Sequence, residues 1–238
     1  MTDFAQLTRK QTILYRKVVS DMEQKVRQME AEHSISQFAK KGIVLTAIMK
    51  LKQICNHPDQ YLGQDVYTPS ESGKFQLLKE KRERVLVFTQ FKEIADDLAA
   101  YLETVFHAKG YVLHGGTPVA KRTEIVDAFQ GEAYVPFIVL SVKAAGTGLN
   151  LTKANHVIHF DRWWNPAVEN QATDRAFRIG QKKDVIVHKF VSQGTIEEKI
   201  DAMLESKKEL AENVIGSGSE KWITELSNEE LFSLLRLE

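Results

Sequence analysis

The sequence contains a single cysteine, Cys55, among its 238 residues. One thiol excludes an internal disulfide and is typical of a reducing compartment. Cys55 and His57 form an isolated C-x-H pair without a second pair of ligands, so we expect a buried thiol and no metal site. The sequence also has no apolar run long enough to span a bilayer and no secretory leader after Met1, so we expect no membrane partner and no secretion.

The sequence also has no net charge at neutral pH. The 32 Lys and Arg residues balance 32 Asp and Glu residues. This balance argues against a uniformly basic nucleic-acid binder, but it leaves local patches open. A hydrophobic content of 43% with 27% charged residues predicts a globular chain of one or two domains.

Hydrophobic periodicity divides the chain into three parts, residues 1–75, 76–194 and 195–238. The first part is helical over residues 7–62, and Asn56-His57-Pro58 ends its second helix. It is also locally basic. A solvated helix face explains that charge about as well as a nucleic-acid partner does.

The third part has the start signals of two helices. Thr195-Ile196-Glu197-Glu198 has the pattern of a capping box and predicts a helix that runs to about Val214. Gly216-Ser217-Gly218-Ser219 predicts a flexible break. Ser227 and Glu230 then predict the cap of a last amphipathic helix.

In the middle part, short apolar runs rich in β-branched residues alternate with helical patterns. The runs lie at residues 85–88, 111–113, 137–140, 157–160 and 185–187. This alternation predicts an α/β fold, with parallel strands covered by helices on both faces. Thr117-Pro118 predicts a helix start, with a capping hydroxyl followed by proline at the first helical position.

Loops dense in glycine, hydroxyl and amide groups follow four of these strands. They are Thr89-Gln90, His114-Gly115-Gly116, Ser141 to Gly148, and Asp161-Arg162-Trp163-Trp164. Ligands of open parallel sheets bind beyond the carboxyl ends of the strands, so these loops predict one functional edge.

The loops differ in how strongly they indicate a ligand. Gly146 and Gly148 would let backbone amides approach an anion, while Ser141 and Lys143 supply a hydroxyl and a positive charge. Glycine pairs are otherwise often turns that need positive φ. Tandem tryptophans are more often core or interface than a ligand platform.

The segment QATDRAFRIGQ, residues 171–181, carries Gln171, Arg175 and Arg178 at spacings of four and three. On a helix these side chains would share one face, and aligned guanidinium groups suit an anion. The alternative is an exposed helix on which Asp174 pairs with Arg178 at i,i+4.

The motifs taken together indicate a family. In chain order they are T-Q-F, L-H-G-G, S-V-K-A-A-G-T-G-L-N-L, D-R-W-W-N-P and Q-A-T-D-R-A-F-R-I-G-Q. This series resembles the second RecA-like lobe of superfamily-two helicase-like motors, and specifically of the Swi/Snf family of DNA-dependent ATPases. The resemblance covers almost the whole chain. It implies a RecA-like parallel sheet sandwiched by helices, with an N-terminal helical protrusion and C-terminal helices.

The resemblance also implies roles for individual residues. Arg175 and Arg178 match arginine fingers that reach the γ-phosphate of ATP bound mainly to the other lobe. Residues on the nucleotide side would be Gln171, Gly146 and Gly148. Residues that contact DNA would be Gln90, Gly115, Gly116, Ser141, Lys143 and Trp164. Trp163 stands where many members carry an acidic residue, so we assign it no role.

The sequence lacks two parts of a complete motor. It has no G-x-x-x-x-G-K-[ST] segment, and no strand ends in an Asp-Glu pair that could hold Mg²⁺. We therefore expect ATP and Mg²⁺ to be held mainly by the N-terminal RecA-like lobe of the same protein, and this chain alone to hydrolyse ATP negligibly.

The expected partners are double-stranded DNA, that first lobe and a DNA-bound protein substrate. The expected location is the cytoplasm or nucleoid in a prokaryote and the nucleus in a eukaryote. Two alternatives stay open. One is the lobe of an RNA or single-strand helicase, and the other is a non-catalytic DNA-binding or docking module.

Overall fold

The computed structural model describes residues 1–32, 36–78, 83–145, 148–163, 166–178, 180–208 and 226–238. The chain divides into two compact units. The sheet unit comprises Met1–Phe4 and Gln76–Val191, and the helical unit comprises Ala5–Phe75 and Ser192–Glu238. The first and third parts expected from the sequence thus fold together, because their apolar helix faces are buried against one another within the helical unit.

A six-stranded sheet, in the order β1-β6-β5-β2-β4-β3, forms the centre of the sheet unit. Its strands are β1 (Thr2–Ala5), β2 (Arg84–Thr89), β3 (Tyr111–Leu113), β4 (Phe137–Ser141), β5 (Ala154–His159) and β6 (Ile186–Ser192). The pairs β2–β4, β2–β5, β3–β4 and β5–β6 are all parallel. The five strands expected from the apolar runs are present, and the expected parallel α/β fold is confirmed.

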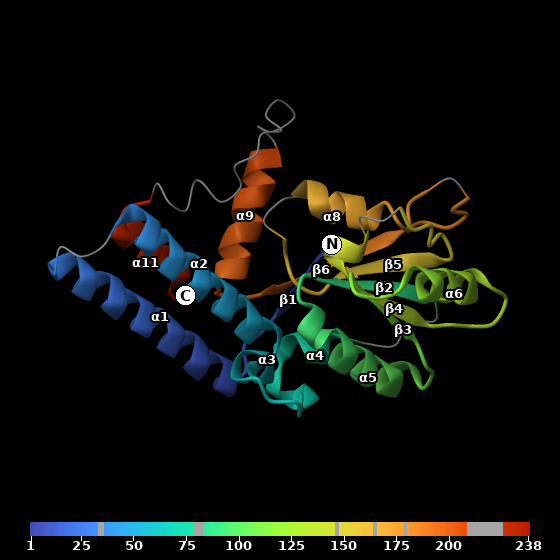
Figure 1. Cartoon of the computed structure of the whole chain (residues 1–238), viewed down its shortest axis with the longest axis horizontal. Coiled ribbons are helices and arrows are strands. Elements are labelled where there is room, and N and C mark those ends of the chain that lie inside the picture. The colour runs from blue at the N-terminus through green and yellow to red at the C-terminus, as the bar shows by residue number, and fades with distance from the viewer. Residues whose placement is uncertain (33–35, 79–82, 146–147, 164–165, 179, 209–225) are drawn as a thin grey trace. The chain divides into compact units, whose positions relative to one another are not determined.

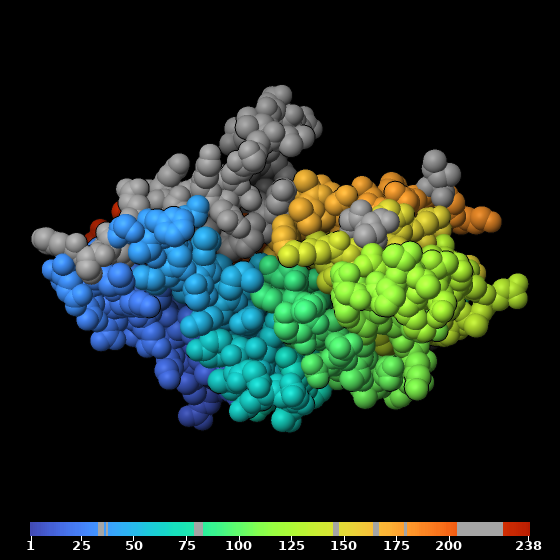
Figure 2. Space-filling model, in the orientation of Figure 1, coloured from blue at the N-terminus to red at the C-terminus, as the bar shows by residue number. Residues whose placement is uncertain are grey.

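Helices cover both faces of the sheet (Figure 1). They are α5 (Ala95–Phe106), α6 (Val119–Gln130), α7 (Val142–Ala145) and α8 (Pro166–Thr173). Phe88 belongs to a buried cluster with Ile125 and Phe129 of α6. On the other face, the ring of Phe137 lies 5.7 Å from that of Phe106 in α5. In Figure 2, α6 forms much of the yellow-green surface that this unit turns to the viewer.

The helical unit contains α1 (Arg9–Ala31), α2 (Gln37–Asn56), α3 (Pro58–Leu62), α9 (Ile196–Lys208), α11 (Asn228–Leu235) and the first three residues of α4 (Gly73–Leu77). A buried ion pair joins its early and late segments, because Nζ of Lys74 lies 2.7 Å from Oε1 of Glu197. Cys55 is a buried thiol, and burial raises its pKa to about 12. None of the helices that the structure describes has an apolar stretch long enough to cross a membrane.

Three helix-capping predictions have different outcomes. Ser227 and Glu230 form the expected capping box. The Thr117 prediction is wrong, because its hydroxyl accepts from the His114 N–H at 3.0 Å and α6 begins without a side-chain cap. At α9, Thr195 Oγ1 accepts from the Glu197 N–H at 3.1 Å, not from Glu198 as a capping box requires. The predicted break at residues 216–219 and the predicted helix end at Val214 lie outside the described residues.

Candidate functional site

The arginine segment does not form the continuous helix that its spacing predicts. The α8 helix ends at Thr173, and the residues from Asp174 to Arg178 continue as turns and bends. The last turn tightens here, because the N–H groups of Arg175 and Ala176 donate three residues back, to the carbonyl oxygens of Ala172 at 3.1 Å and Thr173 at 3.0 Å. The carbonyl oxygen of Arg175 then accepts from the Leu151 N–H at 2.9 Å. The prediction of one shared helix face is therefore wrong. Gln171 is exposed, whereas Arg175 is only 5% exposed.

Arg175 is a buried cation that is only partly satisfied by the chain. Its Nε donates to the backbone oxygen of Gln171 at 3.1 Å. Its Nη1 is buried and has no hydrogen-bond partner among the described residues. Burial, followed by the charge of Arg178, lowers the pKa of Arg175, while Asp174 opposes that shift. The guanidinium stays charged at neutral pH, so an anion would relieve both the missing hydrogen bond and the repulsion.

Arg178 is exposed, and its guanidinium group is hydrogen-bonded to the backbone of Gly148. Its Nη1 donates to the Gly148 carbonyl at 3.2 Å, so the partner of this guanidinium among the described residues is not Asp174. Gly148 has φ +76°, a backbone conformation that is strained for a residue with a side chain. Space is not the constraint, because an added Cβ would meet nothing within 4 Å. The structure thus brings together the two predicted residues Gly148 and Arg178. Gly146 lies outside the described residues.

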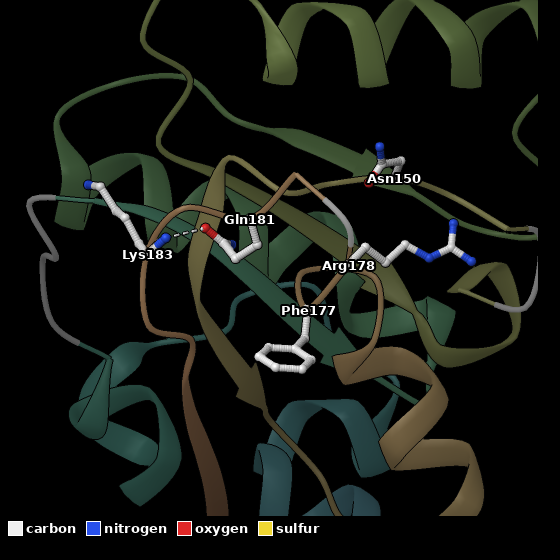
Figure 3. Close-up of a pocket in the computed structure, with 5 residues that line it drawn as sticks. All are labelled: Asn150, Phe177, Arg178, Gln181 and Lys183. Carbon is white, nitrogen blue, oxygen red and sulfur yellow. Dashed lines mark hydrogen bonds between the residues drawn. The ribbon is translucent and has the colours of Figure 1, made fainter.

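A cavity of about 730 Å³ lies beside Arg178 (Figure 3). Its lining consists of Asn150, Phe177, Arg178, Gln181 and Lys183. Figure 3 shows the Arg178 side chain extending away from the Phe177 ring, which is 67% exposed. Gln181 fixes the segment, because its Nε2 donates to the carbonyl oxygens of Ala154 at 2.8 Å and Ala176 at 3.2 Å. The lining role of Phe177 was not predicted, and an exposed aromatic cannot be recognised from its letter alone.

The loops after β2 and β4 lie side by side, because Thr89 and Ser141 are paired in the parallel register. Asp161, from the loop after β5, binds the first of them. Its Oδ2 accepts from the Thr89 hydroxyl at 2.5 Å, and its Oδ1 accepts from the Gln90 N–H at 2.9 Å. Lys143, one residue into α7, is exposed, whereas Ser141 is buried. The loops after β2, β4 and β5 therefore lie at one edge of the sheet, and Asp161 joins two of them.

The glycines after β3 are not explained by backbone conformation. The described glycines with positive φ are Gly63, Gly148, Gly180 and Gly194, so Gly115 and Gly116 adopt ordinary φ. Both are exposed. The reading of this pair as a turn that needs positive φ is therefore wrong.

A buried ion pair supports the loop that contains the tandem tryptophans. Glu169 of α8 accepts from Arg162 Nε at 2.8 Å, from Arg162 Nη2 at 3.1 Å and from the Trp163 N–H at 2.9 Å. Burial alone would raise the pKa of Glu169, but the charge and hydrogen bonds of Arg162 outweigh it, so the pKa is lowered. Trp163 packs against the core cluster, and Trp164 lies outside the described residues. The Arg162–Glu169 pair was not predicted, since no local pattern marks it.

No metal centre is evident in the part of the chain that the structure describes, where no three His, Cys, Asp or Glu residues are placed to share an ion. The edge presents groups that suit an anion. It combines two guanidinium groups, a lysine and glycine-bearing loops at the carboxyl ends of parallel strands. This is the arrangement of a RecA-like motor lobe.

Comparison with known proteins agrees with this class. Residues 72–180 match the model of the helicase conserved C-terminal domain. The chain is 36% identical to the Sulfolobus solfataricus SWI2/SNF2 ATPase C-terminal domain, with a TM-score of 0.79 over 100% of this chain and 98% of that one. The SWI2/SNF2 ATPase core of the same organism in complex with dsDNA gives 37% identity and a TM-score of 0.82, over 100% of this chain and 50% of that one. The chain belongs to the SWI2/SNF2 family of ATPases, as a C-terminal motor lobe.

A curated relative extends the comparison to longer proteins. The putative ATP-dependent helicase/translocase YwqA of Bacillus subtilis is 44% identical over 99% of this chain. The chain spans only 26% of the length of that relative. Most of the length of that relative therefore has no counterpart in this chain.

Proposed function

We propose that this chain is the second motor lobe of an ATP-dependent translocase on double-stranded DNA. In this proposal it supplies Arg175 and Arg178 to ATP that is bound mainly by a first lobe. The names of its relatives support the proposal, since one is called a helicase/translocase and another is a SWI2/SNF2 core in complex with dsDNA.

The observation that carries the nucleotide role is the unsatisfied guanidinium of Arg175. Its buried Nη1 lacks a hydrogen-bond partner among the described residues. The neighbouring guanidinium, that of Arg178, donates to the Gly148 carbonyl. A γ-phosphate oxygen would complete the hydrogen bonding of Arg175 and draw Arg178 from a weak neutral acceptor to a charged one. Guanidinium groups in this role stabilise the charge that develops during phosphoryl transfer. Gln171 supports Arg175 through its backbone oxygen.

The DNA role rests on the other loops of the same edge. Residues proposed to contact DNA are Gln90, Gly115, Gly116, Ser141, Lys143 and Trp164. Contacts to phosphate carry no base information, so binding should tolerate any sequence and weaken steeply with salt. The burial of Ser141 indicates that a phosphate would reach its loop mainly through exposed Lys143.

The division of labour between the lobes follows from the residues. The chain offers arginines for a γ-phosphate but contains neither a P-loop nor a strand-end Asp-Glu pair, so Mg²⁺ and most of the nucleotide would be held by the first lobe. When ATP is bound, the contacts of the arginines with its γ-phosphate favour closure of the two lobes. After hydrolysis these contacts are lost and the lobes open. Alternation between these states would shift the DNA-contacting loops along a phosphate strand. The isolated chain should hydrolyse ATP negligibly.

The choice of nucleic acid is tested by ATP hydrolysis in the longer native protein that contains both lobes. Duplex DNA, single-stranded DNA and RNA of equal nucleotide concentration would be compared as activators across a salt series. The proposal predicts strong stimulation by duplex DNA that falls with salt. Equal or greater stimulation by RNA or single strands would contradict the duplex track, and no stimulation by any of them would contradict a nucleic-acid motor.

A further inference from the structure

The turn between β3 and α6 is closed by its own backbone and by one hydroxyl. The Thr117 N–H donates to the His114 carbonyl at 2.9 Å, and the His114 N–H donates to Thr117 Oγ1 at 3.0 Å. The peptide unit between His114 and Gly115 is therefore held by its carbonyl oxygen. Because a trans peptide points its N–H opposite to its C=O, the Gly115 N–H faces away from the closed turn.

The next peptide unit, between Gly115 and Gly116, is held at both ends by side chains. Nη2 of Arg122, one turn into α6, donates to the Gly115 carbonyl at 2.8 Å. Nε of Arg122 also donates to the Thr117 carbonyl at 2.8 Å. At the other end, the Gly116 N–H donates to Nδ1 of His114 at 3.0 Å. This peptide unit has little freedom to rotate.

These contacts leave one amide of the turn available. The Gly116 N–H is already engaged by the His114 ring, whereas the Gly115 N–H has no hydrogen-bond partner among the described residues. A Cβ added at Gly115 would meet nothing within 4 Å, and its φ is not positive. Neither backbone conformation nor crowding therefore explains a glycine here. Glycine is also used where a ligand approaches the backbone closely.

We propose that the Gly115 N–H is the phosphate donor of this turn, and that His114 and Arg122 are positioning residues that aim it at the DNA backbone. The inference rests on the proposed duplex-DNA function and refines it, because the Gly116 N–H stays with His114. A donor fixed in its binding geometry loses little entropy when the phosphate arrives. Arg122 acts through the loop and touches no phosphate.

The test compares two neighbours on α6. Arg122→Gln and Lys121→Gln each remove one positive charge, but only Arg122 holds the turn, since Lys121 pairs with Glu124 at the surface. Binding of a short mixed-sequence duplex to the 238-residue chain would be measured by fluorescence anisotropy. Losing the positioning hydrogen bonds should weaken binding about three- to tenfold in Arg122→Gln. Lys121→Gln should stay within about twofold.

A second readout separates positioning from a general loss of structure. With ¹⁵N-glycine labelling, duplex addition should shift the Gly115 amide strongly and the Gly116 amide little. Arg122→Gln should abolish the Gly115 shift, while the other glycine amides keep the positions that they have in Lys121→Gln and so show that the fold is retained. His114→Asn, which keeps a short side-chain acceptor, should bind more tightly than His114→Ala.

Each outcome decides between the two proposals. If the unsubstituted chain binds duplex but Arg122→Gln and Lys121→Gln lose equal affinity, or if Gly116 shifts in place of Gly115, the positioning inference is overturned and the proposed function stands. If the unsubstituted chain binds no duplex, the proposed function is overturned and the inference with it. Gly115→Ala, which the open space tolerates, should weaken binding as much as Arg122→Gln.

Discussion

Replacement of Glu169 by glutamine is expected to destabilise the sheet unit severely. Arg162 is 1% exposed and Glu169 is 3% exposed, so the substitution leaves a buried guanidinium without its counter-charge. Breaking a buried pair in this way costs about 3–5 kcal/mol, against a typical domain stability of about 5–15 kcal/mol. The glutamine side chain would also replace one carboxylate oxygen by an NH₂ group. That group cannot accept the hydrogen bond that Arg162 now donates to the oxygen.

The assay is urea unfolding followed by tryptophan fluorescence, because the backbone N–H of Trp163 donates to Glu169 and the Trp163 ring should report on the loop. The double variant Arg162→Met with Glu169→Leu is the matched control, since removal of both charges leaves none unpaired. It should recover most of the lost stability. A loss below about 1 kcal/mol in Glu169→Gln, or a double variant as unstable as the single one, would refute the reasoning.

The lowered pKa of Glu169 adds a pH dependence with a definite sign. A carboxylate whose folded-state pKa lies below its ordinary value of 4.5 contributes stability above pH 4.5. That contribution is lost as the pH falls through the folded-state pKa. Glu169→Gln should therefore show a flatter stability profile in this acidic window than the unsubstituted chain.

Three further substitutions test other parts of the structure. Burial lowers the pKa of His159 from 6.5 to about 4, so its neutral form stabilises the fold above pH 6.5 and the stability falls as the pH drops towards 4. Urea unfolding should show a loss of about 2 kcal/mol between pH 7 and pH 5 that His159→Gln removes; an unchanged profile would contradict the burial argument. Lys74→Met alone should cost the helical unit about 3–5 kcal/mol, and addition of Glu197→Leu should restore most of it; an additive loss in the double variant would count against a coupled pair. Gly148→Ala should cost about 1–2 kcal/mol through positive φ and move the acceptor of Arg178; a neutral effect on thermal unfolding would show that the turn adapts.

Much of the sheet could be predicted because its signal is local. The runs at residues 85–88 and 137–140 are continuous, apolar and rich in β-branched residues, which is typical of strands buried on both faces. Strand β1 could not be predicted. Its four residues are too short to show a period, and its partner is distant, since the Met1 amino group donates to the carbonyl oxygen of Val187, 186 residues away.

The sequence indicates which residue types gather at the predicted edge, but it does not indicate their geometry. The spacing of Arg175 and Arg178 favours a helix, yet α8 ends at Thr173 and the Arg175 carbonyl pairs with the Leu151 N–H of a distant segment. Asp161, Arg162 and Glu169 act through contacts between separate elements, and no local spacing encodes those contacts. The available amide at Gly115 depends on where the His114 and Arg122 side chains point, which only the folded chain determines.

The most direct test of the central claim is ATP hydrolysis by the longer native protein, upstream lobe included, with saturating duplex DNA. Arg175→Ala with Arg178→Ala would be compared with Lys109→Ala plus Lys121→Ala, which removes the same charge from exposed positions of the same unit. The account predicts that the arginine variant loses about a thousandfold or more in turnover while it still binds ATP, and that the lysine variant keeps its activity. Turnover in the arginine variant within tenfold of the unsubstituted protein would contradict it.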